Sequence, residues 1–269
     1  MTPTIGVFDS GFGGLTVLRA LLGRIPHARY AFLGDTARLP YGSKSRRTIA
    51  HYAAEGAEFL VRNQGAEFLV IACNTASALA FDEIQAAVSV PVLGVIEPGA
   101  AAARAASKSG DVLVIATDAT VQSHAYAAAC RAQGLRVLEK ACPLLVPLVE
   151  EGWTDHPVTT QVIDVYLDEL RVHARKEGLH ADTLVLGCTH YPLLRPLLER
   201  AVTPGVRVID SAEATAEAAM HLVGQNGDDL PETAEVRCFA TDSVEKFERL
   251  GPRFLGRPVG HVELIDLGG

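Results

Sequence analysis

The sequence predicts an α/β protein made of two related halves, each with a mostly parallel sheet. Short apolar runs alternate with segments of helical periodicity, which is the pattern of parallel strands linked by helices. Many runs are apolar throughout, as expected for strands covered by helices on both faces. The segment around Cys73 resembles the segment around Cys188, and the strand ending at Asp9 has a counterpart ending at Thr117 at a similar spacing. The repeat predicts two halves that face each other.

The expected strands are short and the expected helices are amphipathic. Strands are predicted over residues 4–8, 30–33, 68–72, 92–95, 112–116, 136–138, 183–187 and 206–209. A helix is expected to begin near Leu15, and others are predicted over residues 48–63, 75–88, 121–133, 158–176 and 212–223. In residues 48–63 the apolar or small positions follow the i, i+3, i+4, i+7 spacing of one helix face. The chain after about Val206 is expected to pack back on the first half.

Composition excludes several classes of protein. The 269 residues are long enough for roughly two domains, and 48% are hydrophobic with a net charge of −8. No basic stripe is present, so no nucleic-acid partner is expected. The N-terminus lacks the basic start of a signal peptide, and Pro91, Glu97 and Arg104 interrupt the weakly apolar residues 86–106, so no membrane span is expected. A cytoplasmic location, where thiols stay reduced, is expected.

The five cysteines are odd in number and show no Cys-x-x-Cys spacing, which argues against a disulfide framework. Cys73 and Cys188 each end a predicted strand and precede a helix. Thr75 is a candidate N-cap and Pro192 a good first-turn residue. A thiol at a helix N-terminus is favoured as thiolate, and His190 is close enough to tune Cys188.

The glycine-rich turn from Asp9 to Gly14 leads from a strand into a helix. Its backbone amides favour an anion. It does not match a dinucleotide fingerprint, because Thr16 takes the third glycine position, and no Gly-Lys-Ser/Thr closes a P-loop. Because Asp9 would repel a phosphate, a ligand with an ammonium group fits better.

Three readings compete for the two matched cysteines. Zinc needs three or four ligands, and only Cys188-x-His190 approaches such a spacing. A Cys–His hydrolase uses one thiol and leaves the other idle. Moving a proton from one face of a carbon to the other needs a base and an acid on opposite sides, which a facing pair supplies. A non-catalytic, two-lobed amino-acid binder is the alternative outside enzymes. No Lys lies in a motif that suggests a Schiff base.

At these residues the sequence resembles the glutamate racemases, cofactor-independent enzymes that make D-glutamate for peptidoglycan. The matching segments run in family order over almost the whole chain: residues 5–16, 34–42, 72–76, 92–98, 146–152, 186–193 and 210–215. One departure is Ala116, where the family often has Gly before the first Thr.

The resemblance implies roles for individual residues. Cys73 and Cys188 would be the acid/base thiols, with Cys73 taking the proton from D-glutamate and Cys188 from L-glutamate. Asp9, His190 and Glu150 would be auxiliary catalytic groups, with Glu151 an open alternative to Glu150. The substrate-binding set would be Asp9, Ser10, Tyr41, Gly42, Asn74, Thr75, Thr117, Thr120, Thr189 and His190. Cys130, Cys142 and Cys238 match no catalytic motif and are interpreted as structural thiols.

The resemblance also implies an architecture and partners. It predicts two flavodoxin-like α/β domains related by a pseudo-two-fold, with the active site in the cleft between them. The expected domains are residues 1–98 plus 208–269, and residues 99–207. Glutamate as substrate, no cofactor, no metal and a homodimer are expected. Within the superfamily, aspartate and hydantoin racemases remain rivals, whereas the presence of both thiols disfavours a related decarboxylase.

Overall fold

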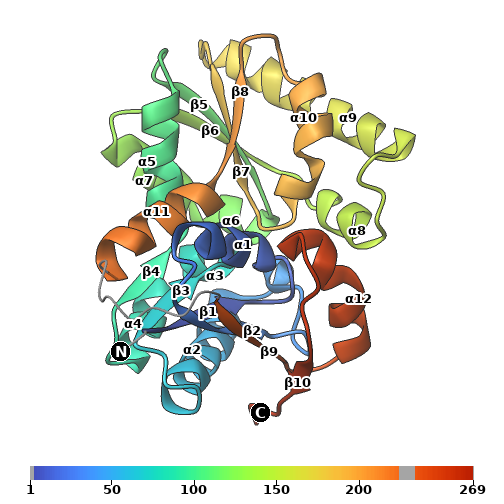
Figure 1. Ribbon diagram of the computed structural model, residues 1–269. Helices are drawn as coiled ribbons and strands as arrows, with labels where there is room; N and C mark the ends of the chain where they lie inside the picture. The colour runs from blue at the N-terminus through green and yellow to red at the C-terminus, as the bar shows by residue number, and fades with distance from the viewer. Residues whose placement is uncertain (1–2, 224–233, 269) are drawn as a thin grey trace.

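The computed structural model describes residues 3–223 and 234–268, and its strands form two sheets (Figure 1). The first sheet has the order β10-β9-β2-β1-β3-β4 and all its pairings are parallel. Its strands are β1 Thr4–Asp9, β2 Arg29–Gly34, β3 Phe68–Ile71, β4 Val92–Gly94, β9 Glu235–Ala240 and β10 Val262–Leu264. We call this sheet and the helices around it the first lobe.

The second sheet repeats the order of four neighbouring strands of the first. Its order is β6-β5-β7-β8, again all parallel, and its strands are β5 Asp111–Ala116, β6 Arg136–Ala141, β7 Thr183–Gly187 and β8 Arg207–Asp210. The order β2-β1-β3-β4 thus recurs as β6-β5-β7-β8, so β1 corresponds to β5 and β3 to β7. The predicted class, two similar mostly parallel α/β units of flavodoxin-like strand order, is confirmed. We call this sheet and its helices the second lobe.

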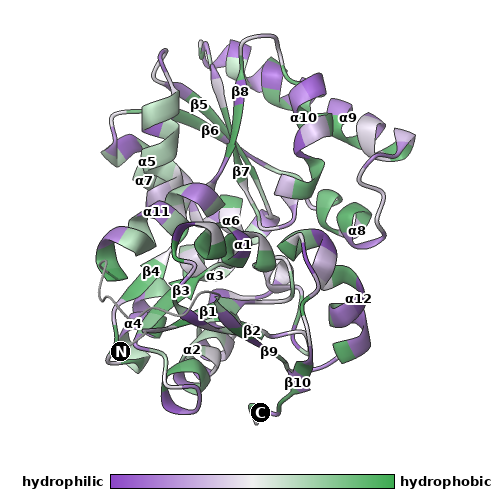
Figure 2. Cartoon of the chain, in the orientation of Figure 1, coloured by the Kyte–Doolittle hydropathy of each residue, from purple (hydrophilic) through white to green (hydrophobic). Residues whose placement is uncertain are grey.

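Helices cover both sheets and fill the space between the lobes (Figure 1). Helix α11 packs against both α1 and α5, and α12 packs against α1 and β10. Figure 2 shows hydrophobic colouring along the strands of the second sheet and hydrophilic colouring on the outer parts of α2 and α9. The helices are α1 Leu15–Arg24, α2 Arg46–Arg62, α3 Asn74–Leu79, α4 Phe81–Ala87, α5 Ile96–Ala106, α6 Asp118–Ser123, α7 Ala125–Ala132, α8 Leu145–Glu150, α9 Pro157–Lys176, α10 Arg195–Ala201, α11 Ser211–Val223 and α12 Val244–Leu255, with 3-10 helices at Tyr41–Ser43 and Tyr191–Leu194.

Two predicted helices are each split in two. The helix expected over residues 75–88 breaks at Ala80, whose φ of −131° and ψ of 8° leave the helical region. The helix expected over residues 121–133 breaks at His124, which adopts the left-handed conformation with φ 56°. Both breaks lie in alanine-rich sequence without Gly or Pro, so the sequence carries no local signal for them.

The end of the chain returns to the first lobe, as expected. Strand β9 pairs with β2, and β10 pairs with β9. The domain limits at 98/99 and 207/208 stay a prediction. Strand β8 crosses the limit at 207/208, and all of it pairs with β7 of the second sheet. Among the helices of the described residues, none is both long and apolar enough to cross a membrane.

Candidate active site

The candidate site residues gather where the carboxyl ends of the central strands of both sheets meet. Asp9 ends β1 and Cys73 follows β3, while Thr117 follows β5 and Cys188 follows β7. Hydrogen bonds join the two groups across the lobes. The Thr16 hydroxyl donates to the Thr189 carbonyl at 3.2 Å, and the Thr75 and Thr117 hydroxyls lie 3.0 Å apart. Parallel sheets place ligand-binding groups at these strand ends.

Cys73 is the N-cap of α3. Its Sγ accepts a hydrogen bond from the Ala76 amide at 3.4 Å and lies 3.4 Å from the Ser10 hydroxyl. Burial raises the pKa of the Cys73 thiol to about 12, and the neighbouring Asp9 charge adds to the rise. The two hydrogen bonds favour the thiolate but do not overcome these effects. At neutral pH Cys73 therefore holds its proton.

His190, beside Cys188, has the opposite character. Burial alone would lower its pKa, but hydrogen bonds and charge interactions with Cys188 and Glu150 raise the pKa of His190 to about 10. Its Nε2 lies 3.3 Å from Glu150 Oε1. His190 is therefore cationic at neutral pH and places a positive charge beside the Cys188 sulfur. Cys73 and Cys188 thus stand in electrostatically different surroundings.

Glu150 lies between two cations. Burial would raise its pKa, but hydrogen bonds to His190 and Lys246 lower the pKa of Glu150 below its ordinary value. Lys246 Nζ is 2.8 Å from Glu150 Oε2. Glu151 is exposed, so the structure brings Glu150 rather than Glu151 to His190. Lys246 comes from α12, a helix that the sequence analysis does not predict, and no motif points to this residue.

Two buried polar atoms of the site have no hydrogen-bond partner. Asp9 accepts the Gly11 amide at Oδ2, 3.0 Å away, while its Oδ1 is unpartnered. Asn74 accepts the Tyr126 hydroxyl at Oδ1, 2.7 Å away, while its Nδ2 is unpartnered. Burial raises the pKa of Asp9, opposed by backbone amides and by His190. A buried acceptor and a buried donor left open suit a ligand that carries both ammonium and carboxylate groups.

Hydroxyl groups from both lobes form a third part of the site. Thr75, Thr117 and Thr120 lie within 2.9–3.1 Å of one another through their Oγ1 atoms. Gly42 packs closely on Thr117, because a Cβ at position 42 would lie 3.0 Å from the Thr117 Cβ. The Tyr41 hydroxyl instead donates to Asp35 Oδ2 at 2.6 Å. Tyr41, one of the predicted binding residues, is therefore buried, and its hydroxyl already donates a hydrogen bond within the protein.

The glycine-rich turn lets the two lobes approach each other. A Cβ at Gly13 would lie 2.4 Å from Thr189 Oγ1 and 2.6 Å from His190 Nδ1, so a larger residue there would push the lobes apart. The neighbouring Phe12 and the α12 residue Phe254 both pack beside the His190 ring, with the Phe254 centroid 5.2 Å away. These rings cover one side of the His190 imidazole.

That Cys130, Cys142 and Cys238 are structural thiols stays a prediction. All five thiols are free and buried, and burial raises the pKa of Cys130 to about 11 and of Cys142 and Cys238 to about 12. Within residues 3–223 and 234–268, no group of three His, Cys, Asp or Glu side chains is placed to hold a metal ion.

The two-lobed parallel α/β fold, with its site at the facing strand ends, can be compared with known proteins. A family model described as Asp/Glu/Hydantoin racemase matches residues 16–219. The glutamate racemases of Koribacter versatilis and Syntrophus aciditrophicus are 53% and 48% identical, covering 99% and 98% of this chain and 98% and 96% of theirs. The chain therefore belongs to the glutamate racemase family.

Solved structures agree with this placement. The glutamate racemase of Bacillus anthracis superposes with a TM-score of 0.89 at 38% identity, covering 98% of both chains. That of Francisella tularensis, solved in complex with D-glutamate, gives 0.87 at 34% identity, covering 99% of this chain and 98% of that one. An aspartate racemase of Picrophilus torridus, at 20% identity and a TM-score of 0.58, shares the fold alone.

Proposed function

We propose that this protein interconverts L- and D-glutamate by a two-base proton transfer that needs no cofactor. The observation that carries the proposal is the pair of buried cysteines at equivalent strand ends in unlike surroundings. Cys73 keeps its proton, because its pKa is raised to about 12, whereas Cys188 faces the His190 cation. In the direction from L-glutamate, Cys188 would act as the base and Cys73 as the acid that inversion of a carbon centre requires.

The reaction from L-glutamate uses both groups once. The Cys188 thiolate takes the α-proton, and the electron pair of the broken C–H bond is delocalised into the α-carboxylate. The Cys73 thiol then donates its proton to the opposite face, which gives D-glutamate. Cys188 ends as thiol and Cys73 as thiolate, so the enzyme is ready for the reverse reaction or resets by proton exchange. Asp9 and the His190–Glu150 pair tune the two thiols.

The substrate would be held by the open polar groups. Asp9 Oδ1 accepts from the ammonium group, and Asn74 Nδ2 donates to a carboxylate. Hydroxyls of Ser10, Thr75, Thr117, Thr120 and Thr189, with amides near Gly42, supply further donors. The net charge of −8 gives no attraction to an anionic substrate, so these fixed donors in a buried site must stabilise the developing negative charge.

The product serves peptidoglycan synthesis in this proposal, and the cytoplasm is the compartment in which both thiols stay reduced. The test is circular-dichroism detection of D-glutamate formed from L-glutamate, using protein dialysed against a chelator and free of pyridoxal phosphate. Cys73→Ala and Cys188→Ala should each lose about 10²- to 10⁴-fold in activity. Cys238→Ala, at a buried thiol that belongs to none of the matching motifs, is the matched control. Full activity in either of the first two variants contradicts the mechanism, and faster turnover of L-aspartate contradicts the substrate.

A further inference from the structure

Tyr126 is a buried tyrosine that joins the two lobes and takes no part in the proposed proton transfer. It lies on α7 of the second lobe and is fully buried. Its hydroxyl donates a hydrogen bond to Asn74 Oδ1, 2.7 Å away, on α3 of the first lobe. Asn74 is itself 3% exposed, and its Nδ2 has no hydrogen-bond partner. The Tyr126 hydroxyl therefore holds one end of a carboxamide whose other end is open.

Two glycines make room for the Tyr126 ring. A Cβ at Gly99 would lie 3.1 Å from Tyr126 Cε1, and a Cβ at Gly187 would lie 2.9 Å from Tyr126 Cε2. Gly99 belongs to α5, where the chain first crosses from one lobe to the other, and Gly187 ends β7, directly before Cys188. The ring is thus enclosed on two sides, which fixes the direction of its hydroxyl.

Ser211 sets the direction of the hydrogen bonds at this hydroxyl. It is buried and begins α11, where the chain crosses between the lobes a second time. Burial raises the pKa of Tyr126, and a hydrogen bond from the Ser211 side chain opposes the rise. Tyr126 therefore keeps its proton at neutral pH. Because its oxygen accepts from Ser211, its single proton is left for Asn74 Oδ1, and the Asn74 Nδ2 donor is turned to the open side.

The break at His124 lets the second lobe reach two neighbouring residues of α3. The Thr120 hydroxyl on α6 lies 3.1 Å from the Thr75 hydroxyl, and Tyr126 on α7 reaches Asn74. In one continuous helix, side chains six positions apart would point about 120° away from each other. His124 ends α6 and precedes α7 in the left-handed conformation. The two short helices can therefore each direct one side chain at α3.

We propose that Tyr126 is a positioning residue, which holds the Asn74 carboxamide so that its Nδ2 faces a carboxylate of the substrate. The proposal rests on the proposed function, because it names the group that orients one of the substrate-binding residues. A donor that is already fixed in a buried site needs no reorganisation when it meets a negative charge. A carboxamide that is free to turn can present its oxygen instead, which repels a carboxylate. Ser211 gives the sequence motif at residues 210–215 a role in this arrangement.

The first test is Tyr126→Phe, which removes the hydroxyl and keeps the ring. The apparent Kd for racemic glutamate, measured by isothermal titration calorimetry, should rise by about 10-fold, because the Asn74 carboxamide is no longer held. Tyr30→Phe is the matched control. Tyr30 is also buried, but its hydroxyl donates to the Leu21 and Ile25 carbonyls within the first lobe, so the Kd should stay unchanged.

A double-mutant cycle separates positioning from a general loss of structure. If Tyr126 acts through Asn74, Tyr126→Phe should have no further effect on the Kd in a chain that already carries Asn74→Ala. A merely structural role would instead give the same loss in both backgrounds. A circular-dichroism spectrum shows whether each variant folds.

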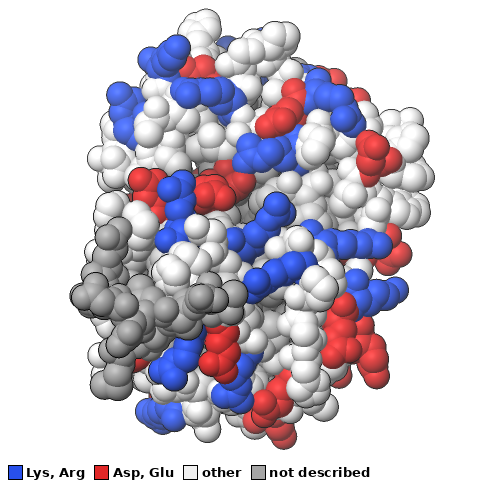
Figure 3. Space-filling view, viewed as in Figure 1, with Lys and Arg blue, Asp and Glu red and all other residues white. Residues whose placement is uncertain are grey.

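Ser211→Ala repeats the test without changing the tyrosine. It removes the donor to Tyr126, so it should also raise the Kd, and this effect too should vanish in the Asn74→Ala background. The outer side of α11 carries acidic side chains at the surface (Figure 3), and Glu213 and Glu217 of this helix are exposed. Glu217→Ala is therefore the control on the same helix and should leave the Kd unchanged.

Binding and turnover distinguish this proposal from the proposed function. Racemic glutamate is already at equilibrium, so its binding can be measured whether or not the chain racemises it. Glutamate binding without formation of D-glutamate from L-glutamate would contradict the proposed function alone. An unchanged Kd in Tyr126→Phe, an equal loss with and without Asn74→Ala, or the absence of glutamate binding would overturn the positioning role of Tyr126.

Discussion

His190 is the residue at which burial and charge compete most directly. It is buried, yet its pKa is raised from 6.5 to about 10, because Cys188 and Glu150 stabilise its charge more than burial penalises it. A group whose pKa is raised on folding stabilises the folded state fully below the unfolded pKa. That stabilisation is lost as the pH rises through the folded value.

We therefore expect the free energy of unfolding to depend on His190 in a defined pH window. The difference in stability between the unmodified chain and His190→Asn should be largest below pH 6.5 and should shrink as the pH rises to about 10. Urea denaturation at a series of pH values measures it. His51→Asn, at an exposed histidine with 64% of its side chain accessible, is the control for removing an imidazole. A flat difference for His190→Asn would contradict the assigned charge.

At the scale of single residues, the sequence could predict the groups that lie inside motifs. Cys73, Cys188, Asp9 and His190 follow strands directly, so their place at the strand ends follows from the α/β pattern alone. Lys246 could not be predicted, because it meets Glu150 from 96 positions away in the chain. The hydrogen bond from the Tyr41 hydroxyl to Asp35 could not be predicted either, because it depends on the path of the loop between the two residues.

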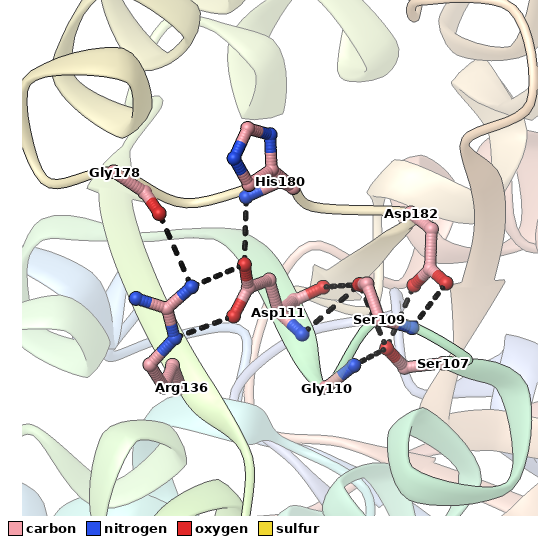
Figure 4. Close-up of polar contacts among 8 residues, drawn as sticks. All are labelled: Ser107, Ser109, Gly110, Asp111, Arg136, Gly178, His180 and Asp182. Carbon is pink, nitrogen blue, oxygen red and sulfur yellow. Dashed lines mark hydrogen bonds and ion pairs between the residues drawn. The ribbon is translucent and has the colours of Figure 1, made fainter.

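At the scale of elements, the amino ends of β5, β6 and β7 are tied by two buried or half-buried carboxylates (Figure 4). Asp111 accepts two hydrogen bonds from Arg136, at 2.7 and 2.6 Å, and one from the His180 amide. Asp182 accepts the Ser107 hydroxyl and the Lys108 and Ser109 amides at 2.7–2.8 Å. These bonds hold the loop before β5 against the start of β7.

Asp182→Ala should destabilise the protein without damaging the candidate site. Hydrogen bonds to a charged group contribute about 1.5–3 kcal/mol, and the donors would be left without their acceptor, so we expect a loss of roughly 2–3 kcal/mol. Thermal and urea unfolding measure the loss. Because the network lies at the amino ends of the strands, opposite the site, kcat/KM at low temperature should be unchanged.

The control for this prediction is Asp168→Ala, at an exposed ion pair with Arg171. Exposed pairs contribute about 0–1 kcal/mol, so its effect should be small. Two outcomes would contradict the prediction: an equal loss of stability in both variants, or a fall in kcat/KM with Asp182→Ala.

Helices and strands could be predicted where they lie in the core, and could not be predicted where the local sequence carries no clear pattern. The central strands of both sheets are uniformly apolar and were predicted almost to their ends. Strands β9 and β10 were missed, because these strands at one side of the sheet carry mixed polar sequence, as the exposed Glu235 and Arg237 of β9 show. The break at His124 occurs in sequence that has no Gly or Pro to signal it.

At the scale of the whole molecule, the ion pair between Lys246 and Glu150 joins the two lobes beside the candidate site. Lys246 lies on α12, which packs on the first lobe, while Glu150 ends α8 of the second lobe. Gly152 also fits closely on α12, since a Cβ there would lie 2.2 Å from Arg253. Because Glu150 in turn contacts His190, the relative position of the lobes and the charge beside Cys188 are coupled through one carboxylate.

Lys246 should therefore act as a positioning residue for Glu150. Lys246→Met removes a cation that lowers the pKa of Glu150, so this pKa should rise and the carboxylate should be lost at higher pH. The acid limb of the kcat/KM profile for L-glutamate should move to higher pH, and kcat should fall by about 10-fold or more, since small misplacements of catalytic groups are costly. Lys246→Arg should restore most of both, because it returns the charge. Lys108→Met is the control for loss of a positive charge alone, because Lys108 is exposed and lies before β5, at the amino ends of the strands. An unshifted acid limb in Lys246→Met would show that Lys246 fastens the lobes without tuning the site.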